Sequence, residues 1–413
     1  MTSGKRTARG AQKGGLLLRW RGLLQAACAL AALLPFAAQA RVYTEWRPRL
    51  SLGAGYDDNV KFDGSGGDGI GEAIPGLKLG VFGEHALHLD LDCEASFARL
   101  ANPGRFSDAG YGFSNSALCR AEFRDHPAEF IKTHWSMRTT YARDAFAISS
   151  LGLLLRAGQT QVFESRLSGA VSQEISTRGR LEYGVFADAL NFGTNDPGNG
   201  YQVAPQVGYG YRTSERNTFD ATVREQLFLG AGATAVPGLH GAAPSGLLAE
   251  GTSTLLGFTR RLTPTMTATL RGGPEVVTGP VQAATLFPAL RFELSNDLPT
   301  SGVHVVLAHD LVLGPSQAGA LVGDIAELGM FGNLSERFVA HGRADLYRNS
   351  GVDQQGRLGI VGYSGEAGVD FRFGREWSIG VAGVRDARLT QRDGGNVDRD
   401  VFQLRLSWEK ARQ

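Results

Sequence analysis

The sequence predicts an all-β fold, a transmembrane up-and-down antiparallel β-barrel of about 18 strands, with 16 as the alternative. Side chains alternate in polarity along many extended segments. Short and long links alternate between these segments. The chain also holds 56 glycines in 413 residues, about twice the usual share of roughly 7%. These three observations argue against a helical protein.

The first 40 residues have the layout of a secretory signal peptide. They contain six basic residues and no acid, then the apolar run 22–37 and the small-residue site Ala38-Gln39-Ala40. We expect cleavage before Arg41, so that residues 41–413 form the barrel. A single-pass anchor is the alternative, although the run is short and Gln25 and Pro35 interrupt it.

The charge of the processed chain narrows the class of protein. The leader carries six of the 42 basic residues and none of the 41 acids, so its removal takes the formal charge from +1 to −5. A nucleic-acid partner would require a basic stripe, and the sequence has none. Beyond the leader no run of about 18 apolar residues predicts a transmembrane helix.

Residues 49–60, RLSLGAGYDDNV, are the first predicted strand. Apolar and aromatic side chains occupy one face of this segment, namely Leu50, Leu52, Ala54 and Tyr56. Small and polar residues occupy the other, since the side-chain period of a strand is two. We expect this strand to pair with the last one, residues 400–410, and to close the barrel. Its inward Gly53 and Gly55 are then expected to leave the lumen wall clear.

Four further segments, residues 86–100, 129–143, 218–230 and 360–375, show the same two-faced pattern. Aromatic residues recur on the apolar face near segment ends, as the interfacial girdles of membrane barrels require. They are Trp135, Tyr141, Tyr183, Tyr209, Tyr211, Tyr363, Trp377 and Trp408.

Alternation would also suit a soluble β-sandwich, and the links decide between the two folds. Tight turns are expected at sites such as His126-Pro127 and Thr263-Pro264, and longer links at segments such as 144–158 and 231–247. This rhythm is typical of short periplasmic turns and long extracellular loops. Residues 278–333 alternate least, because prolines interrupt them, so the strand count is least certain there.

The polar faces are expected to line a lumen with mixed charge. The candidate lumen-facing residues are Asp90, Asp92, Glu94, Arg120, Glu122, Arg124, Lys132, His134, Arg138, Arg224, Arg291, Glu293, Arg343, Asp345, Glu366, Asp370, Arg372 and Arg405. Such a lumen suits neutral or weakly charged hydrophilic solutes. Alternatively, the charges only pair across strands and hold the shape of the barrel.

Two local features lead to hypotheses. The link 144–158 is rich in leucine and is expected either to fold inward as a constriction or to rest at the lipid headgroups. Cys93 and Cys119 fall on the same outward face of consecutive strands. They either form a cross-strand disulfide or remain two small apolar residues facing lipid.

The sequence contains little that indicates enzymatic catalysis. No Gly-x-Ser-x-Gly elbow or HExxH motif occurs, and the histidines are isolated or lie in turns and loops. We therefore expect no enzyme activity, no cofactor and no metal.

Residues 52–60, LGAGYDDNV, resemble the start of the outer-membrane β-barrel proteins encoded with exopolysaccharide biosynthesis and export systems, the β-barrel porin 2 type. The chain is also similar in size and strand count to barrels of the Wzx/Wzy-dependent pathway. The resemblance implies an outer-membrane conduit for a secreted polysaccharide, in contact with lipid and partnered by a periplasmic polysaccharide-export protein. The alternatives are a general diffusion porin for small hydrophilic solutes and a structural or surface-interaction barrel.

Overall fold

The computed structural model describes residues 42–58, 66–83, 87–102, 113–142, 162–191, 199–230, 246–279, 282–313, 320–351, 359–390 and 397–410. The predicted leader and the leucine-rich link 144–158 lie outside these ranges. In the part of the chain that is described, no helix is long and apolar enough to cross a membrane.

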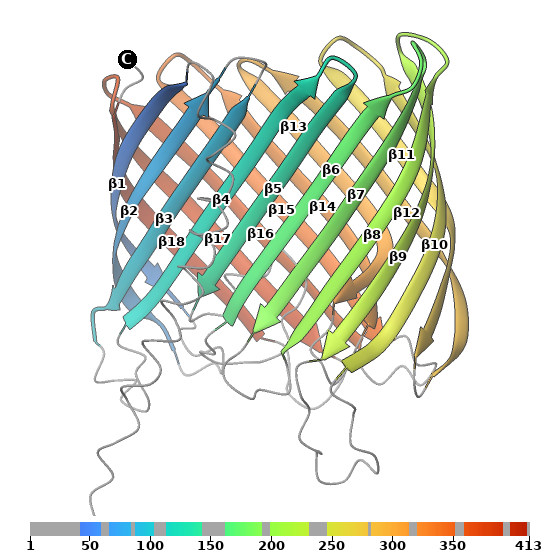
Figure 1. Cartoon of the computed structure of the whole chain (residues 1–413). Helices are drawn as coiled ribbons and strands as arrows, with labels where there is room; N and C mark the ends of the chain where they lie inside the picture. Colours follow the sequence, from blue (N-terminus) through green and yellow to red (C-terminus); the bar gives the residue numbers. More distant parts are fainter. Residues whose placement is uncertain are drawn as a thin grey trace, which may run out of the picture.

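The described residues form a single antiparallel sheet that closes on itself (Figure 1). Its 18 strands are β1 (Tyr43–Asp57), β2 (Asp68–Phe82), β3 (His88–Leu100), β4 (Phe113–Ala128), β5 (Ile131–Ala142), β6 (Val162–Glu174), β7 (Gly179–Asn191), β8 (Gly200–Arg212), β9 (Asn217–Gly230), β10 (Gly246–Arg261), β11 (Met266–Gly279), β12 (Gln282–Leu298), β13 (Ser301–Leu313), β14 (Ala320–Asn333), β15 (Phe338–Gly351), β16 (Gly359–Arg372), β17 (Trp377–Thr390) and β18 (Val397–Glu409). Each strand pairs with its sequence neighbours, as the sequence predicts for an up-and-down barrel of this strand number.

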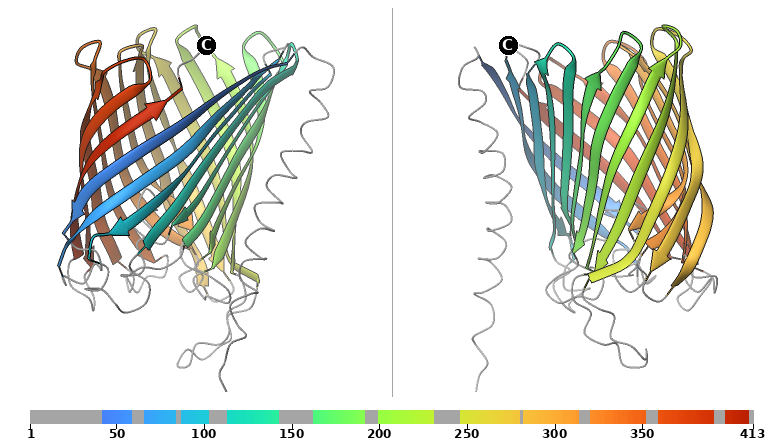
Figure 2. Two further views of the ribbon diagram at one scale, coloured as in Figure 1. Left: turned by 90° about the vertical axis from the view of Figure 1, so that its left-hand side faces the viewer. Right: turned by 45° about the vertical axis from the view of Figure 1, so that its right-hand side comes forward.

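The seam between β1 and β18 confirms the pairing predicted for the first strand. Leu50 lies opposite Trp408, and Tyr56 lies opposite Phe402. Figure 2 shows the blue β1 running beside the red β18. Closure removes the two open edges that the strands would otherwise present to lipid, where unpaired backbone groups are costly.

Short turns occupy one rim of the barrel, which we call the periplasmic rim by the rule for outer-membrane barrels. They include residues 175–178, 213–216 and 262–265. Most links at the opposite, extracellular rim are longer, but β11 and β12 are joined there by residues 280–281 alone. The predicted alternation of link lengths is therefore wrong at this one link.

The turn predicted at His126-Pro127 is also wrong. β4 continues to Ala128, and the turn consists of Glu129 and Phe130. The pairing of β4 with β5 shifts between Asp125 and Ala128, so the proline lies in an irregularity of the strand. Proline lacks the N–H that a regular ladder needs, and such a shift accommodates it.

Residues 278–333, where alternation was weakest, contain the end of β11 and all of β12, β13 and β14. Pro288 on β12 lies directly opposite Pro274 on β11. The pairing of β10 with β11 skips Gly273 and Pro274, and the pairing of β12 with β13 begins only at Leu290, beyond Pro288. Both prolines are tolerated because the ladder is interrupted at this place rather than continuous.

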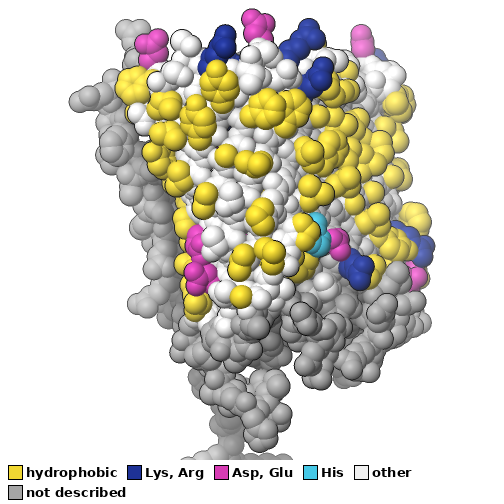
Figure 3. All heavy atoms as spheres, turned by 90° about the vertical axis from the view of Figure 1, so that its right-hand side faces the viewer, with side chains coloured by type: hydrophobic (Ala, Val, Ile, Leu, Met, Phe, Trp, Pro, Cys, Tyr) yellow, Lys and Arg dark blue, Asp and Glu magenta, His cyan; other side chains and the backbone are white. Residues whose placement is uncertain are grey.

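The outer face carries a belt of exposed apolar side chains, seen on one side of the barrel in Figure 3. Leu256 and Leu286 are 67% and 68% exposed, and Phe402 is 63% exposed. Charged side chains gather towards the two rims of this view. A continuous apolar belt on a closed barrel is the surface that hydrocarbon covers in a membrane.

Aromatic residues cluster where the strands meet the periplasmic rim. Trp46, Tyr211, Phe219, Phe338 and Trp377 lie near strand ends at this rim, and all are exposed. Their amphipathic rings suit the headgroup level of a bilayer. The girdle includes Tyr211 and Trp377 of the aromatic set that the sequence predicts.

Candidate functional site

The inner wall of the barrel is the candidate functional site. On strands such as β8, β9 and β18 the exposed apolar residues occupy alternate positions. The strand pairing carries this alternation around the barrel, so the positions between them face the lumen. All 18 candidate lumen-facing residues fall on these inward positions, on β3, β4, β5, β9, β12, β15, β16 and β18. What they do there depends on their partners.

Several ion pairs on this wall reach over an intervening strand, and three of these arrangements share one geometry. Arg49 on β1 contacts Asp92 on β3 at 2.6 Å and Glu94 at 2.7 Å. In the same row of paired residues, Gly76 lies between Arg49 and Glu94. A Cβ atom at residue 76 would lie 2.5 Å from the Arg49 Nε. The glycine therefore makes room for the arginine to cross β2.

The same arrangement recurs at two other places. Arg405 and Glu72 flank Gly53 in one row, and their charged groups are 3.6 Å apart. Arg271 and Asp220 flank Gly257, and the Arg271 Nε donates to Asp220 over 3.1 Å. We call these three arrangements the cation–glycine–anion rows. The expectation that Gly53 leaves the wall clear is wrong, because the ion pair covers it.

A second feature narrows the lumen near the extracellular rim. Arg224 on β9 donates to both carboxylate oxygens of Asp310 on β13, over 2.9 and 2.7 Å. It also contacts Glu275 on β11 at 3.4 Å. β8 and β13 approach within 8 Å between Cα atoms, although four strands separate them in the sheet. The wall formed by β9 to β12 is therefore folded into a side lobe.

Side chains fill this side lobe. Phe228 and Val277 have no exposed surface, and Glu275 has none either. The Gln226 amide donates to Glu275 over 2.6 Å, and the Gln202 amide donates to Gln226 over 2.5 Å. Buried polar groups of this kind are tolerated because they are hydrogen-bonded to each other. The side lobe is a packed region and not an open passage.

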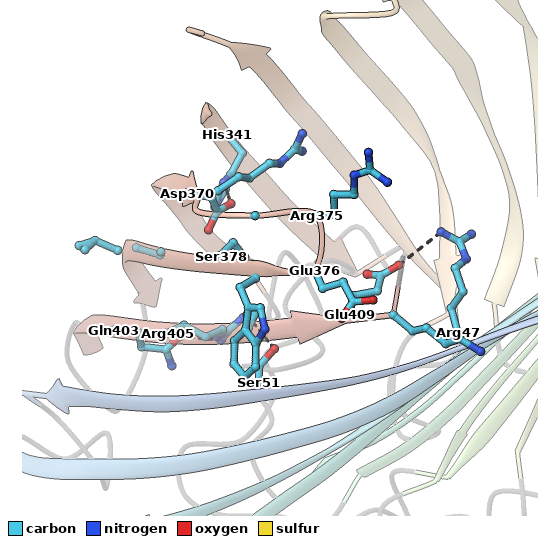
Figure 4. A pocket seen from close by; sticks show the side chains of 18 of the residues that line it. Arg47, Ser51, His341, Asp370, Arg375, Glu376, Ser378, Gln403, Arg405 and Glu409 are labelled. Carbon is cyan, nitrogen blue, oxygen red and sulfur yellow. Dashed lines mark hydrogen bonds and ion pairs between the residues drawn. The ribbon is translucent and has the colours of Figure 1, made fainter. Parts of the chain in front are cut away.

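At the periplasmic rim the lumen instead forms a polar cavity of about 480 Å³ beside the seam (Figure 4). Its lining comes from β15 to β18 and from β1. Arg47 donates to Glu409 across the seam over 3.4 Å, and Lys78 reaches the same carboxylate at 3.3 Å. His341 contacts Asp370 at 3.4 Å. A hydrated solute would meet charge of both signs here.

Most other candidate residues pair locally. Glu122 is the acceptor for Arg124 and for His134, and Lys132 contacts Glu174 at 2.7 Å. Asp90 contacts His88 at 2.7 Å. These pairs lie towards the periplasmic ends of β3 to β6.

On the opposite wall, Arg291 contacts Glu293 at 2.6 Å and Arg343 contacts Asp345 at 2.8 Å. Glu366 lies 3.8 Å from His341. Arg372 lines the periplasmic cavity together with Arg405. Among the described residues, no ion-pair partner lies within 4 Å of Arg120, Arg138 or Arg372, so these three arginines differ from the paired charges above.

Several residues of the inner wall were missed by sequence reasoning. Arg49, Glu72 and Lys78 lie on β1 and on the glycine-rich β2. Asp310 and Glu275 lie in or beside the proline-interrupted region. The signal that could have found Arg49 is its position one residue before Leu50, since neighbouring residues of a strand face opposite sides.

Cys93 and Cys119 lie directly opposite each other on β3 and β4, with Cα atoms 4.1 Å apart. The structure records them as a disulfide. The separation is below the limit of about 7 Å for a bridge. The bond in the protein itself stays a prediction for which a gel assay is given below.

No group of three or more histidine, cysteine or acidic residues among the described residues could hold a metal ion. The dense ion pairing on the inner wall also leaves few acidic groups of these strands without a cationic neighbour. The wall therefore offers a polar, charged surface for solutes.

No protein-family model matches the chain, and a search of curated proteins finds no match. The fold is similar to Pseudomonas aeruginosa OccK2 (OpdF) in complex with glucuronate, at 10% identity over 88% of this chain and 98% of that one, with a TM-score of 0.43. It is similar to Pseudomonas aeruginosa OpdQ, at 9% identity over 89% and 97% of the two chains and a TM-score of 0.42. It is also similar to a BenF-like porin from Pseudomonas fluorescens, at 9% identity over 90% and 99%, with a TM-score of 0.42. The fold assignment rests on the closed sheet itself, which is that of a transmembrane β-barrel.

Proposed function

We propose that this chain is an outer-membrane channel for small hydrophilic solutes. The observation that carries the proposal is the combination of a closed 18-stranded sheet, an apolar outer belt and an inner wall of ionisable side chains. Barrels of about 16 to 18 strands are wide enough to leave an aqueous channel. A polar lining lowers the cost of moving a hydrated solute past the wall.

The folded side lobe favours small solutes over a polymer. Arg224 and Asp310 bring β9 and β13 together, and the residues behind them are buried. The passage is then limited to the part of the barrel outside the side lobe. A narrower passage admits small molecules more readily than a hydrated chain.

Conductance of the full-length protein in planar bilayers tests this proposal. Gly329 faces the lumen on β14, and no heavy atom lies within 4 Å of the place where its Cβ would be. Gly329→Trp should therefore lower the single-channel conductance. Gly365 has the same empty surroundings but faces outward on β16, so Gly365→Trp is the matched control.

A stable conductance that falls in Gly329→Trp and stays unchanged in Gly365→Trp supports a solute path through the lumen. Absence of any conductance from the folded wild-type protein would refute the channel. An equal effect of the two substitutions would indicate leakage around the barrel instead.

We keep export of a secreted polysaccharide, with a periplasmic export protein as partner, as a second proposal. Its support is the resemblance of residues 52–60 to barrels encoded with such export systems. Deleting the gene separates the functions. Loss of surface polysaccharide with normal small-solute permeability supports export, and the reverse supports diffusion. No change in either supports a structural or surface-interaction barrel.

A further inference from the structure

Three arginines stand side by side on the inner wall. Arg120 on β4 lies directly opposite Arg138 on β5, and Arg138 lies directly opposite Arg166 on β6. All three occupy inward positions, since they alternate with lipid-facing residues. Like charges placed directly opposite each other destabilise a sheet. A row of this kind therefore calls for a compensating negative charge.

In this row of Arg120, Arg138 and Arg166, which we call the arginine row, only Arg166 directly contacts acidic side chains of the described residues. Arg166 contacts Glu164 at 2.9 Å and Asp188 at 3.1 Å. Within the ranges that the structure describes, neither Arg120 nor Arg138 has an ion-pair partner. The Nε atom of Arg138 is buried and finds no hydrogen-bond acceptor in the part of the chain that the structure describes. A buried donor without an acceptor is costly, more so when it is charged.

A fourth arginine faces this row from the opposite wall. Arg343 on β15 is near enough for its positive charge to act on Arg138, together with the positive charges of Arg120 and Arg166 and the negative charge of Glu164. β15 and β5 are far apart in the order of the sheet. The two walls therefore present positive charge to each other across the lumen. Arg343 itself is compensated by Asp345 at 2.8 Å.

We propose that Arg120 and Arg138 bind the oxyanion group of a solute in the lumen, a carboxylate or a phosphate. The planar guanidinium group matches either oxyanion with two parallel N–H donors, and such charge-assisted hydrogen bonds are the strong ones. A bound oxyanion would supply the missing acceptor of Arg138 and the negative charge between the two arginines. The inference rests on the proposed channel function, because the anion reaches these residues through the lumen.

The test uses the full-length protein in planar bilayers and in detergent. The variant is Arg120→Gln/Arg138→Gln. The matched control, Arg271→Gln/Arg291→Gln, also removes two inward positive charges, but from arginines that have acidic partners. Heat-modifiability on gels and circular dichroism verify that each variant folds. The probes are glucuronate for a carboxylate, inorganic phosphate for a phosphate, and glucose as the uncharged reference.

In the wild type we expect glucuronate or inorganic phosphate to block the conductance, and glucose to have no such effect. In Arg120→Gln/Arg138→Gln the concentration for half-block should rise at least about tenfold, since two charged donors are lost. The preference for chloride over potassium, measured from reversal potentials, should fall as well. The control should change the half-block concentration by much less. Arg120→Lys/Arg138→Lys should keep the preference for chloride but bind both probes more weakly, because lysine lacks the fork of donors.

Unchanged block and ion preference in a conducting Arg120→Gln/Arg138→Gln variant would overturn the inference and leave the channel function intact. An equal loss in the control would also overturn it, because total lumen charge would then explain the effect. If the wild type does not conduct, the channel function fails. Calorimetric titration of the detergent-solubilised protein with the same probes then decides separately whether the two arginines bind an oxyanion.

Discussion

Gly76 should tolerate a larger side chain only if Arg49 is removed. In the first cation–glycine–anion row, Arg49 crosses β2 directly over Gly76 to reach Asp92 and Glu94. A valine at residue 76 would displace the guanidinium group from both carboxylates. We therefore expect Gly76→Val to destabilise the barrel, although valine has the higher β-propensity.

The magnitude follows from the contacts. A hydrogen bond to a charged group contributes about 1.5–3 kcal/mol when well shielded. Asp92 and Glu94 are 34% and 39% exposed, which lowers the value towards about 1 kcal/mol for each contact. Loss of both contacts then costs about 2 kcal/mol, offset by up to about 1 kcal/mol of β-propensity. The expected net loss for Gly76→Val is about 1–2 kcal/mol.

The assay is equilibrium unfolding in urea with the protein in lipid vesicles, followed by tryptophan fluorescence. The background variant is Arg49→Ala, in which the arginine no longer occupies the space above Gly76. There we expect Gly76→Val to be neutral or stabilising, so that the double-mutant cycle gives a coupling of about 2 kcal/mol. Gly71→Val is the matched control on the same strand, because Gly71 is exposed and has empty surroundings.

The reasoning is refuted if Gly76→Val costs the same free energy with and without Arg49. That result would mean that the backbone of β3 sets the cost instead, since the Cys93 carbonyl oxygen lies 3.1 Å from the place where a Cβ at residue 76 would be. A Gly71→Val variant as unstable as Gly76→Val would refute it as well, because valine would then be unfavourable anywhere on β2.

Three further predictions concern the outer face, the side lobe and the pair Cys93 and Cys119. Leu404→Arg should destabilise the barrel by about 2–4 kcal/mol in vesicle unfolding, because Leu404 is exposed in the middle of β18 where hydrocarbon surrounds it; a cost near zero would place this strand outside the bilayer. Arg224→Met should cost about 3–5 kcal/mol by leaving the buried Glu275 without its cation, and adding Glu275→Gln should recover part of that loss; no recovery would argue against electrostatics as the cause. Reduction should change the gel mobility of the unfolded wild type, and Cys93→Ser should show the reduced mobility under both conditions; identical mobility of the wild type with and without reductant would rule out a bond to Cys119.

At the seam, the period-two alternation of side chains predicts the register between the first and last strands. The strict alternation of residues 49–60 and 400–410 assigns Leu52 and Leu406 to the same outward face. The structure pairs these two residues directly. Because a shift of one residue would turn every side chain to the wrong face, alternation in both strands specifies the register between them.

The same pattern does not predict where strands end at places where proline and glycine interrupt the alternation. The predicted turn at His126-Pro127 was wrong for this reason, and so was the predicted alternation of link lengths where β11 meets β12. A proline signals either a turn or an irregularity inside a strand, and the local sequence does not distinguish them. For Pro127 the pairing of β4 with β5 on both sides of the proline shows that it lies in an irregularity inside a strand.

Sequence alone determined that this chain forms a closed barrel with an apolar outside, a charged inside and a seam between its first and last strands. Alternation is a local property, so it can be read residue by residue. Tertiary structure decided which inward charges meet. Arg49 and Glu94 face each other only because three strands align around Gly76, and Arg224 meets Asp310 only because the wall folds into the side lobe. The surroundings of Arg138 are likewise set by the neighbouring strands and by the opposite wall. Residues distant in the chain decide whether its charge has a partner.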